Sequence, residues 1–324
     1  MGLLHTAGAR HFAIDDDGVK GLVLDLRLNP GGFLEQALAI SNLFLKQGAE
    51  IASVRGRNAE PQTYYAREAP IAPSLPLVIL TDQYTASASE IVAGALQDHD
   101  RAVIVGTTSF GKGLVQQLFP LDGGWALKMT TAKWYTPSGR SIQKERVLND
   151  EGVLIEVHPD SLETDSARKA RPIFHSDGGR VVYGGGAITP DLVVQPDTFT
   201  TAEQEYRKAT AAQSQAIYTA LYDYAQELKS TVKPNFVVQP AWRAELYRRL
   251  EQKNIQIDRK VFEGASHLID SQLDRLVSRF AFGDSTATRR SVGDDVQLRK
   301  AVDLLKQGQS QKDLFTLVAS GSRH

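Results

Sequence analysis

A serine placed directly before an expected helix is the first group in this sequence that could carry out covalent chemistry. Ser87 lies in the segment Thr85–Ile91, between an apolar run that ends at Thr81 and an apolar helical pattern. Free backbone N–H groups at a helix N-terminus can stabilise a developing anion, so a serine there can act as a nucleophile. Serine also caps helices without any catalytic role. This segment alone is compatible with both interpretations.

Histidine is the usual base for a serine nucleophile, and one of the seven histidines lies near the expected core. His99 follows the helix that begins after Ser87, and a helix of about 12 residues is ~18 Å long. The two side chains are therefore expected at opposite ends of the helix. We interpret His99 as a surface histidine that interacts with the negative end of the helix dipole.

Lysine can replace histidine as the base when its amine is kept neutral by burial. Lys112 lies between Gly111 and Gly113, which permit an unusual and close backbone path. Phe110 precedes this loop, and its ring would offer the amine apolar surroundings. Gln116, four residues after the lysine, could accept a hydrogen bond from the amine and orient it. The spacing favours a serine–lysine pair, although a surface lysine in a glycine loop has the same local sequence.

Two further motifs have other interpretations. Ser109–Lys112 and Ser141–Lys144 both match S-x-x-K, but the Ser-Asp-Asn and Lys-Thr-Gly tripeptides of penicillin-binding proteins are absent. Gly106–Lys112 matches the phosphate-loop pattern G-x-x-x-x-G-K, yet Gly113 replaces the hydroxyl ligand and the next apolar segment stops at Pro120. The carboxylates show no metal-ligand spacing. We therefore expect neither a metal nor a cofactor.

The elements that must position these residues alternate between strand and helix patterns. The expected strands are Gly21–Arg27, Leu77–Thr81 and Ala102–Gly106, and a helical apolar pattern lies in each interval between them. The first interval also contains a short expected strand, Ile51–Val54, and an exposed hairpin or loop over Arg55–Ser74. This alternation predicts an α/β fold with a parallel sheet. In such sheets functional sites gather at the carboxyl ends of the strands. The serine turn lies at that edge.

An oxyanion requires two N–H donors about 3 Å away from it. The backbone N–H of Ala88, directly after the serine, is one candidate. The turn Asn29–Gly32 follows the first strand and leads into a helix, so Gly31 or Gly32 could supply the second donor. A turn with no role in anion binding can have the same sequence, and the sequence does not distinguish the two glycines as the donor.

The C-terminal part of the chain has a different pattern. Apolar residues from Tyr206 to Leu228 recur at the spacing of one long amphipathic helix, and three more helical patterns follow. We predict two domains, an α/β core over residues 1–198 and an α-helical domain over residues 199–324.

Composition excludes several classes of function. The formal net charge is −1, which gives no electrostatic reason to expect nucleic acid binding. The absence of cysteine excludes disulfides, thiolate catalysis and cysteine-based zinc sites. No apolar run is long enough for a membrane-spanning helix.

Taken together, four segments resemble the C-terminal processing peptidases, which are also called tail-specific proteases. The matching residues are Asp25–Gly32, Ser87–Ile91, Phe110–Gly113 with Gln116, and Tyr135–Gln143. The intervals of 25 residues from the serine to the lysine and of four more to the glutamine are similar to the family's arrangement. The likeness extends over residues 20–143 and is weak in the helical tail.

The resemblance implies a ClpP/crotonase-like αββ core and a serine endopeptidase that cleaves proteins or peptides near their C-termini. It implies that Ser87 is the nucleophile, Lys112 the base and Gln116 the residue that orients the lysine. It also implies an oxyanion hole made by Ala88 and either Gly31 or Gly32. Ser89 fits the family spacing less well than its neighbour two residues earlier.

Family members have a PDZ domain before the Asp-Leu-Arg segment, whereas few residues precede that segment here. The expectation is therefore an N-terminally truncated chain that lacks the PDZ domain and the export signal. Most members act in the bacterial periplasm, so an extracytoplasmic location is expected. Protein or peptide substrates are the expected partners, together with a homo-oligomer formed through the helical domain.

Two other functions remain compatible with the sequence. One is a catalytically inactive peptide-binding or scaffolding relative. The other is a crotonase-like protein that handles acyl-CoA, for which no pocket is evident in the sequence and in which Lys112 would have no role.

Overall fold

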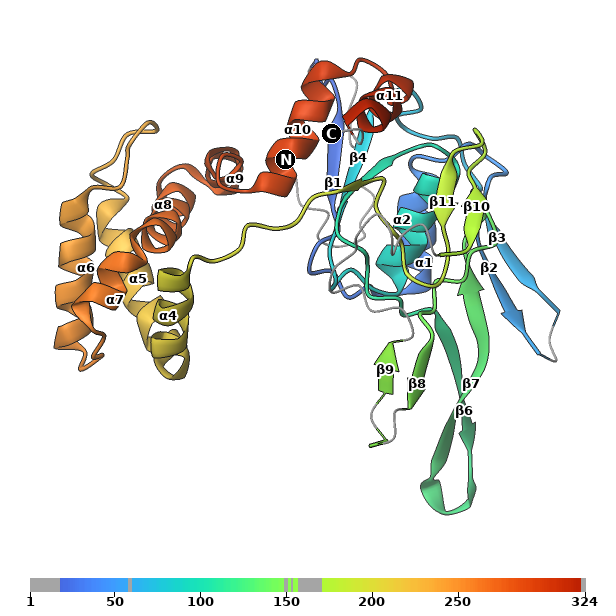
Figure 1. Cartoon of the computed structure of the whole chain (residues 1–324), viewed down its shortest axis with the longest axis horizontal. Helices are drawn as coiled ribbons and strands as arrows, with labels where there is room; N and C mark the ends of the chain where they lie inside the picture. Colours follow the sequence, from blue (N-terminus) through green and yellow to red (C-terminus); the bar gives the residue numbers. More distant parts are fainter. Residues whose placement is uncertain (1–17, 58–59, 149–150, 153, 157–170, 322–324) are drawn as a thin grey trace. The chain divides into compact units, whose positions relative to one another are not determined.

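The computed structural model describes residues 18–57, 60–148, 151–152, 154–156 and 171–321 (Figure 1). The chain divides into two compact units. Residues 196–299 form a helical unit, and the described residues before 196 and after 299 form an α/β unit. Each unit is described here by itself.

A parallel sheet of four short strands forms the centre of the α/β unit, in the order β1-β4-β5-β12. The strands are β1 (Leu22–Asp25), β4 (Leu77–Thr81), β5 (Val103–Gly106) and β12 (Leu192–Val193). The register pairs Asp25 with Leu80, and Thr81 with Gly106. The carboxyl ends of three strands therefore meet at one edge, which confirms the predicted parallel α/β core.

Two helices pack around this sheet. α1 (Leu34–Asn42) packs against α2 (Ala88–Asp98), and all 11 residues of α2 are buried. α2 also packs closely against neighbouring loops, because a Cβ at Gly94 would lie 2.7 Å from Thr136 Cγ2 and 2.9 Å from Ile188 Cδ1. The helix that begins after the serine is thus held on all sides and cannot shift without disturbing the core.

An antiparallel sheet in the order β3-β2-β7-β6 completes the larger part of the unit. Its strands are β2 (Glu50–Gly56), β3 (Gln62–Tyr65), β6 (Leu114–Pro120) and β7 (Ala126–Tyr135). β6 and β7 project from the core as a long hairpin with a short 3-10 turn, Asp122–Gly124, at its tip (Figure 1). The segment after Gly113 is therefore a strand, which excludes the phosphate-loop interpretation because that motif requires a helix there.

The remaining elements are short hairpins and helices. Two hairpins are formed by β8 (Arg146–Leu148) with β9 (Leu154–Glu156) and by β10 (Ile173–His175) with β11 (Val181–Tyr183). The helices are α4 (Thr201–Thr210), α5 (Ser214–Leu228), α6 (Pro240–Gln252), α7 (Arg259–Gly264), α8 (Ser266–Phe282), α9 (Asp284–Ser291), α10 (Val296–Gln307) and α11 (Gln311–Gly321). Among the described residues, no helix is both long and apolar enough to cross a membrane.

The helical unit confirms the predicted α-helical C-terminal part, with one difference. The long helix expected from Tyr206 to Leu228 is broken into α4 and α5 by a 3-10 turn at Ala211–Gln213. The hydroxyl of Thr210 donates to the Tyr206 carbonyl at 2.7 Å, and such a bond to the preceding turn commonly bends helices.

The end of the chain also differs from the sequence expectation, which assigned it to the helical domain. Residues from 300 onward group with the α/β unit. The side-chain amide of Gln311 accepts from Leu77 N at 2.8 Å and donates to Leu77 O at 3.3 Å, at the first residue of β4. Leu314 of α11 is completely buried. The last helix is thus a structural part of the α/β unit.

Candidate active site

The serine turn has a backbone conformation that few residues other than glycine adopt. Ser87 has φ 57° and ψ −117° and is the residue directly before α2. A non-glycine residue in such a conformation costs on the order of 1–3 kcal/mol and persists only where its surroundings impose it. The side chain of Ser87 is half-buried, while Ala86 and Ala88 on either side are buried. Ser87 is therefore more accessible than the residues on either side of it.

A buried carboxylate imposes this conformation. Glu90 is completely buried, and its Oε2 accepts from the backbone N–H of Ser87 at 2.7 Å and of Lys112 at 2.8 Å. Its Oε1 accepts from the hydroxyl of Ser109 at 2.5 Å and from the N–H of Gly111 at 2.7 Å. We call these five residues the Glu90 network. The network joins the serine turn to the lysine loop through a single side chain.

The charge state of Glu90 reflects two opposing effects. Burial raises the pKa of the Glu90 carboxyl above its usual value, and the four hydrogen bonds from its donors oppose that rise. All four partners are donors, so only the ionised carboxylate can accept from all of them at once. Ionised Glu90 is the form that holds Ser87 and Lys112 in the observed arrangement.

The glycine turn after β1 lies directly against the serine turn. The N–H of Ala86 donates to the Asn29 carbonyl at 3.0 Å. Gly31 has φ +91°, and a Cβ there would lie 2.6 Å from Ala86 O and 2.8 Å from Ala88 N. Only glycine permits this approach of the two backbones. The structure therefore brings both expected sources of oxyanion donors together.

The two glycines of this turn differ in whether their N–H groups are occupied. The N–H of Gly31 donates to the side-chain oxygen of Asn29 at 3.0 Å. For the N–H groups of Gly32 and Ala88, the part of the chain that the structure describes provides no acceptor. Within the described residues of the serine and glycine turns, these two N–H groups are therefore available to a ligand.

The backbone of the lysine loop follows the close path expected for its glycines. A Cβ at Gly111 would lie 2.3 Å from Lys144 Cγ, and one at Gly113 would lie 2.5 Å from Gln143 N. The loop also bonds to the serine segment, since the N–H of Phe110 donates to the Thr85 carbonyl at 2.9 Å. The backbone of the expected base is thus fixed next to the serine turn.

The lysine side chain, in contrast, does not have the buried environment that the sequence analysis expected. Lys112 is exposed, and Phe110 beside it is 42% exposed. Gln116 lies on β6, and its amide nitrogen donates to Thr130 Oγ1 at 3.4 Å. Among the described residues the structure records no hydrogen bond that joins Lys112 to Ser87 or to Gln116.

His99 is at the opposite end of α2, as expected, and it is more enclosed than a surface histidine. Its side chain is only 14% exposed. Nδ1 lies 2.6 Å from Asp177 Oδ2 and Nε2 lies 2.6 Å from the Glu50 carbonyl oxygen. His99 cannot act on Ser87 from this position.

Two buried groups support the site and were not singled out in the sequence analysis. Glu90 forms an S-x-x-E pattern with Ser87, which is the sequence signature of a helix start and could have drawn attention to it. Arg140 is 1% exposed, and its guanidinium pairs with Asp98 and donates to Gln97 Oε1 at 3.0 Å. This pair fixes the C-terminal end of α2, and no local pattern in the sequence points to it.

Comparison with known proteins supports the same segments. Residues 9–153 match peptidase family S41. A carboxy-terminal-processing protease of Bartonella bacilliformis is 53% identical over 131 residues, which are 40% of this chain and 30% of that protein. The carboxy-terminal processing protease CtpA of Bacillus subtilis is 41% identical over 136 residues, 42% of this chain and 29% of that protein.

Among solved structures, the photosystem II D1 C-terminal processing protease is 33% identical, with a TM-score of 0.37. That match covers 45% of this chain and 38% of the other. The chain spans about a third of the length of the curated relatives quoted above. The segment at residues 9–153 is therefore similar to peptidase family S41, and the relatives quoted above are carboxy-terminal processing proteases.

Proposed function

We propose that this chain is the catalytic part of a serine endopeptidase that cleaves proteins or peptides near their C-termini through an acyl-enzyme. In this proposal Ser87 is the nucleophile, Lys112 is the general base and Gln116 orients the lysine. The observation that carries it is the Glu90 network, which fixes the backbones of Ser87 and Lys112 with two bonds to one carboxylate oxygen, at 2.7 and 2.8 Å.

The reaction begins when the neutral amine of Lys112 takes the proton of the Ser87 hydroxyl. The oxygen attacks the peptide carbonyl carbon, and the carbonyl oxygen becomes an oxyanion. The departing amine takes the proton back from the lysine as the C–N bond breaks, which leaves an ester on Ser87. Water then hydrolyses the ester with Lys112 again as base.

The oxyanion would be stabilised by the N–H groups of Ala88 and Gly32. Both N–H groups lack an acceptor among the described residues, whereas the N–H of Gly31 is occupied by Asn29. Gly31 has a different role in this proposal. It permits the close approach that places its neighbour's N–H beside the serine turn. This assignment favours Gly32 over Gly31 as the second donor.

Exposed apolar side chains around the serine support a peptide substrate. Leu28, Tyr84 and Phe110 are 71%, 56% and 42% exposed. Their backbones lie next to the turn, since Leu28 N bonds to Asp82 and Phe110 N bonds to Thr85. A bound peptide that covers these side chains would also remove water from the amine of Lys112, which favours the neutral, basic form.

Location and assembly are also part of the proposal. The relatives quoted above are bacterial carboxy-terminal processing proteases. We extend to this chain the periplasmic or otherwise extracytoplasmic location expected from the resemblance. Assembly of a homo-oligomer through the helical unit is part of the same proposal.

Cleavage of an unfolded protein substrate tests the proposal. Ser87→Ala and Lys112→Ala should each abolish cleavage while far-UV circular dichroism stays unchanged. Ser89→Ala is the matched control for the serine, and Lys128→Ala, an exposed lysine on β7, is the control for the base. Proteolysis by Ser87→Ala at the rate of the parent chain would disprove the role of this serine.

The exposure of Lys112 favours a second candidate, a catalytically inactive relative that only binds peptides. A serine-reactive fluorophosphonate probe separates the two. Labelling at Ser87 that is lost in Lys112→Ala requires an activated hydroxyl and supports the enzyme. Peptide binding without labelling would support the inactive relative.

A further inference from the structure

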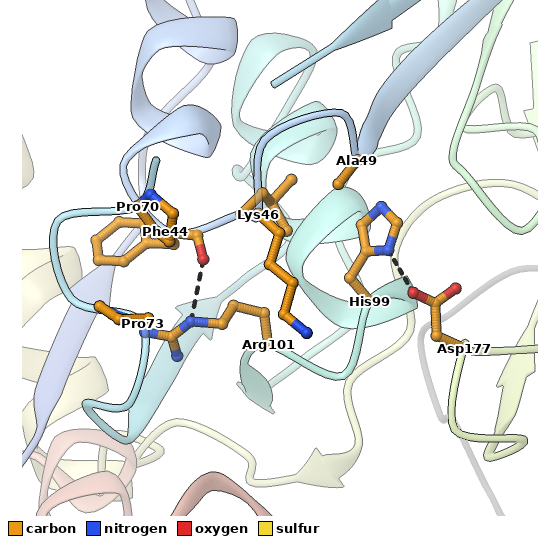
Figure 2. A pocket seen from close by; sticks show the side chains of 9 residues that line it. Phe44, Lys46, Ala49, Pro70, Pro73, His99, Arg101 and Asp177 are labelled. Atoms are coloured by element: carbon orange, nitrogen blue, oxygen red, sulfur yellow. Dashed lines mark hydrogen bonds and ion pairs between the residues drawn. The ribbon is translucent and has the colours of Figure 1, made fainter. Parts of the chain in front are cut away.

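A second site lies at the end of α2 that is remote from Ser87. A cavity of about 370 Å³ is bounded by His99 and Arg101 directly after α2, by the segment from Phe44 to Ala49 after α1, by the loop from Pro70 to Pro73 before β4, and by Asp177 (Figure 2). The 11 residues of α2 separate it from the serine turn by ~17 Å. The cavity therefore does not belong to the candidate active site.

Two cationic side chains in this cavity have no carboxylate partner among the residues that the structure describes. The guanidinium of Arg101 donates only to backbone carbonyls, those of Phe44 at 3.2 Å and Ala72 at 2.6 Å. Burial lowers the pKa of Arg101, because removal from water disfavours its charged form. Lys46 is exposed, and no hydrogen bond or ion pair is recorded for its ammonium group in the described part of the chain.

Figure 2 shows how these groups are arranged. The end of the Lys46 side chain lies between the side chains of Arg101 and His99 in this view, and Asp177 lies on the far side of His99. Asp177 is already paired, since its Oδ2 lies 2.6 Å from His99 Nδ1. Asp177, the one carboxylate among the described residues that line the cavity, is thus occupied by His99 and is not recorded as a partner of Arg101 or Lys46.

The walls next to the cations are apolar. The ring of Phe44 lies under the Arg101 guanidinium, whose carbon is 5.7 Å from the ring centroid. Leu45, Pro70 and Pro73 complete this side of the cavity. A ligand that satisfies both features needs an anionic group for the cations and a compact apolar body for these walls. A carboxylate is the anion that a guanidinium binds with matching planar geometry.

We propose that this cavity binds a carboxylate carried on a small apolar body, with Arg101 and Lys46 as its cationic partners. The carboxylate can come from the terminus of a peptide or free acid, or from an acidic side chain. This inference does not depend on the proposed peptidase activity, because no residue of the candidate active site lines the cavity.

Binding of three small probes to the full chain tests the proposal. N-acetyl-leucine has a terminal carboxylate and an apolar body, and N-acetyl-leucinamide is its uncharged match. The blocked peptide acetyl-Leu-Glu-Leu-amide has a carboxylate only on its side chain. Each is titrated into Ser87→Ala, which prevents turnover, and the amide signals of Lys46, Ala49 and His99 are followed by NMR.

N-acetyl-leucine should shift these signals, and N-acetyl-leucinamide should bind at least about tenfold more weakly, as expected for loss of a charged hydrogen-bonding group. Binding of acetyl-Leu-Glu-Leu-amide as well would identify acidic side chains as a second source, and its failure would restrict the site to terminal carboxylates. Equal binding of N-acetyl-leucine and its amide, or no binding of either carboxylate probe, would overturn the proposal.

Variants identify the partners. Lys46→Gln changes an exposed side chain, so it should fold, and it should weaken N-acetyl-leucine about fivefold with a smaller salt dependence. Arg101→Gln should weaken it further, although it also removes bonds to Phe44 and Ala72. Asp177→Asn removes the like charge and should leave binding unchanged or tighter. Lys128→Gln is the matched control. Parent-like affinity of the Lys46→Gln chain would exclude this lysine and overturn the site as described.

Discussion

The serine turn and the lysine loop of the candidate active site differ in how far the surrounding protein fixes their functional groups. Ser87 is held by a completely buried carboxylate in a conformation that its own sequence disfavours. The backbone of Lys112 is held by the same carboxylate, but its side chain is exposed and makes no recorded contact with the serine among the described residues. The protein thus fixes the backbone positions of both residues, and it leaves the amine of Lys112 exposed to solvent.

Under the proposed serine–lysine mechanism, this difference indicates which parts of the site must be in place before the substrate binds. Backbone position and the oxyanion donors require a rigid core, because a misplaced donor stabilises nothing. The neutral state of the amine requires only that water be removed, which a bound peptide can do. Changes in the Glu90 network should therefore have larger effects on activity than changes around the lysine side chain.

Removal of the Glu90 carboxylate should have the largest effect. Glu90→Ala leaves the N–H groups of Ser87, Gly111 and Lys112 without their buried acceptor. We expect kcat/KM to fall by ~10³-fold, about 4 kcal/mol in transition-state stabilisation. Stability should also fall by roughly 2–5 kcal/mol, because buried donors lose their partner.

Urea denaturation separates the two effects, with activity measured where both chains are fully folded. Glu35→Ala, an exposed glutamate in the first turn of α1, is the control and should keep the parent activity. Parent-like kcat/KM of folded Glu90→Ala would show that the serine turn does not need the network.

The close approach of the glycine turn should come next. Gly31→Ala puts a Cβ 2.6 Å from Ala86 O at a residue with φ +91°, so the turn must move away from the serine. We expect kcat/KM to fall by ~10²-fold, because the proposed second oxyanion donor is displaced. Gly48→Ala is a matched control, because Gly48 has φ +84° and open space around it.

Both glycine variants should lose about 1 kcal/mol of stability through the backbone conformation alone. Only Gly31→Ala should lose activity, as measured with a peptide substrate at fixed temperature. A similar loss of activity in both variants would mean that backbone strain, and not the contact with the serine turn, explains the result.

The pH dependence of stability gives a third test. The direction in which the unfolding free energy changes with pH follows from the pKa of Glu90. Burial raises the pKa of this carboxyl, so the folded chain binds its proton more tightly than the unfolded chain. The contribution of Glu90 to stability is then greatest below the ordinary carboxyl pKa and declines as the pH rises through the raised value. Relative to Glu90→Gln, which does not titrate, the parent chain should lose stability between acidic and neutral pH.

The measurement is the unfolding free energy of both chains in urea across that pH range. Protonation also removes one acceptor position, so activity should decline in acid while circular dichroism shows a folded chain. A difference between the two chains that grows in favour of the parent as the pH rises would contradict the direction given for Glu90.

The sequence predicted the parts of this site that depend on local pattern. The strand ends, the turn Asn29–Gly32 and the start of α2 follow from apolar periodicity and glycine placement, and the parallel sheet then brings them to one edge. The four hydrogen bonds of Glu90 could not be predicted, although its S-x-x-E pattern marks a helix start.

Long-range contacts explain the remaining differences. α11 joins the α/β unit because Gln311 pairs with Leu77, 234 positions away in the sequence. The exposure of Lys112 depends on what covers the loop, which its flanking glycines and Phe110 do not determine. The break between α4 and α5 lies next to Thr210, whose hydroxyl bonds to the Tyr206 carbonyl, and it interrupts an otherwise continuous apolar pattern.

The residue proposed to orient the lysine should show the smallest effect. Gln116 is exposed on β6, and among the described residues its side chain makes one long hydrogen bond, to Thr130. In the proposed mechanism it therefore orients the lysine only after a peptide covers the amine. Gln116→Ala should lower kcat about fivefold and leave KM nearly unchanged, because it affects the orientation of the base and not the binding of the peptide. Gln117→Ala, whose side chain points to the other face of the strand, is the matched control. A loss of activity as large as that of Glu90→Ala would mean that Lys112, like the serine turn, must be positioned before the substrate binds. If Gln116→Ala and Gln117→Ala have the same kcat, Gln116 has no part in the mechanism. The bound substrate would then be the remaining influence on the protonation state of Lys112.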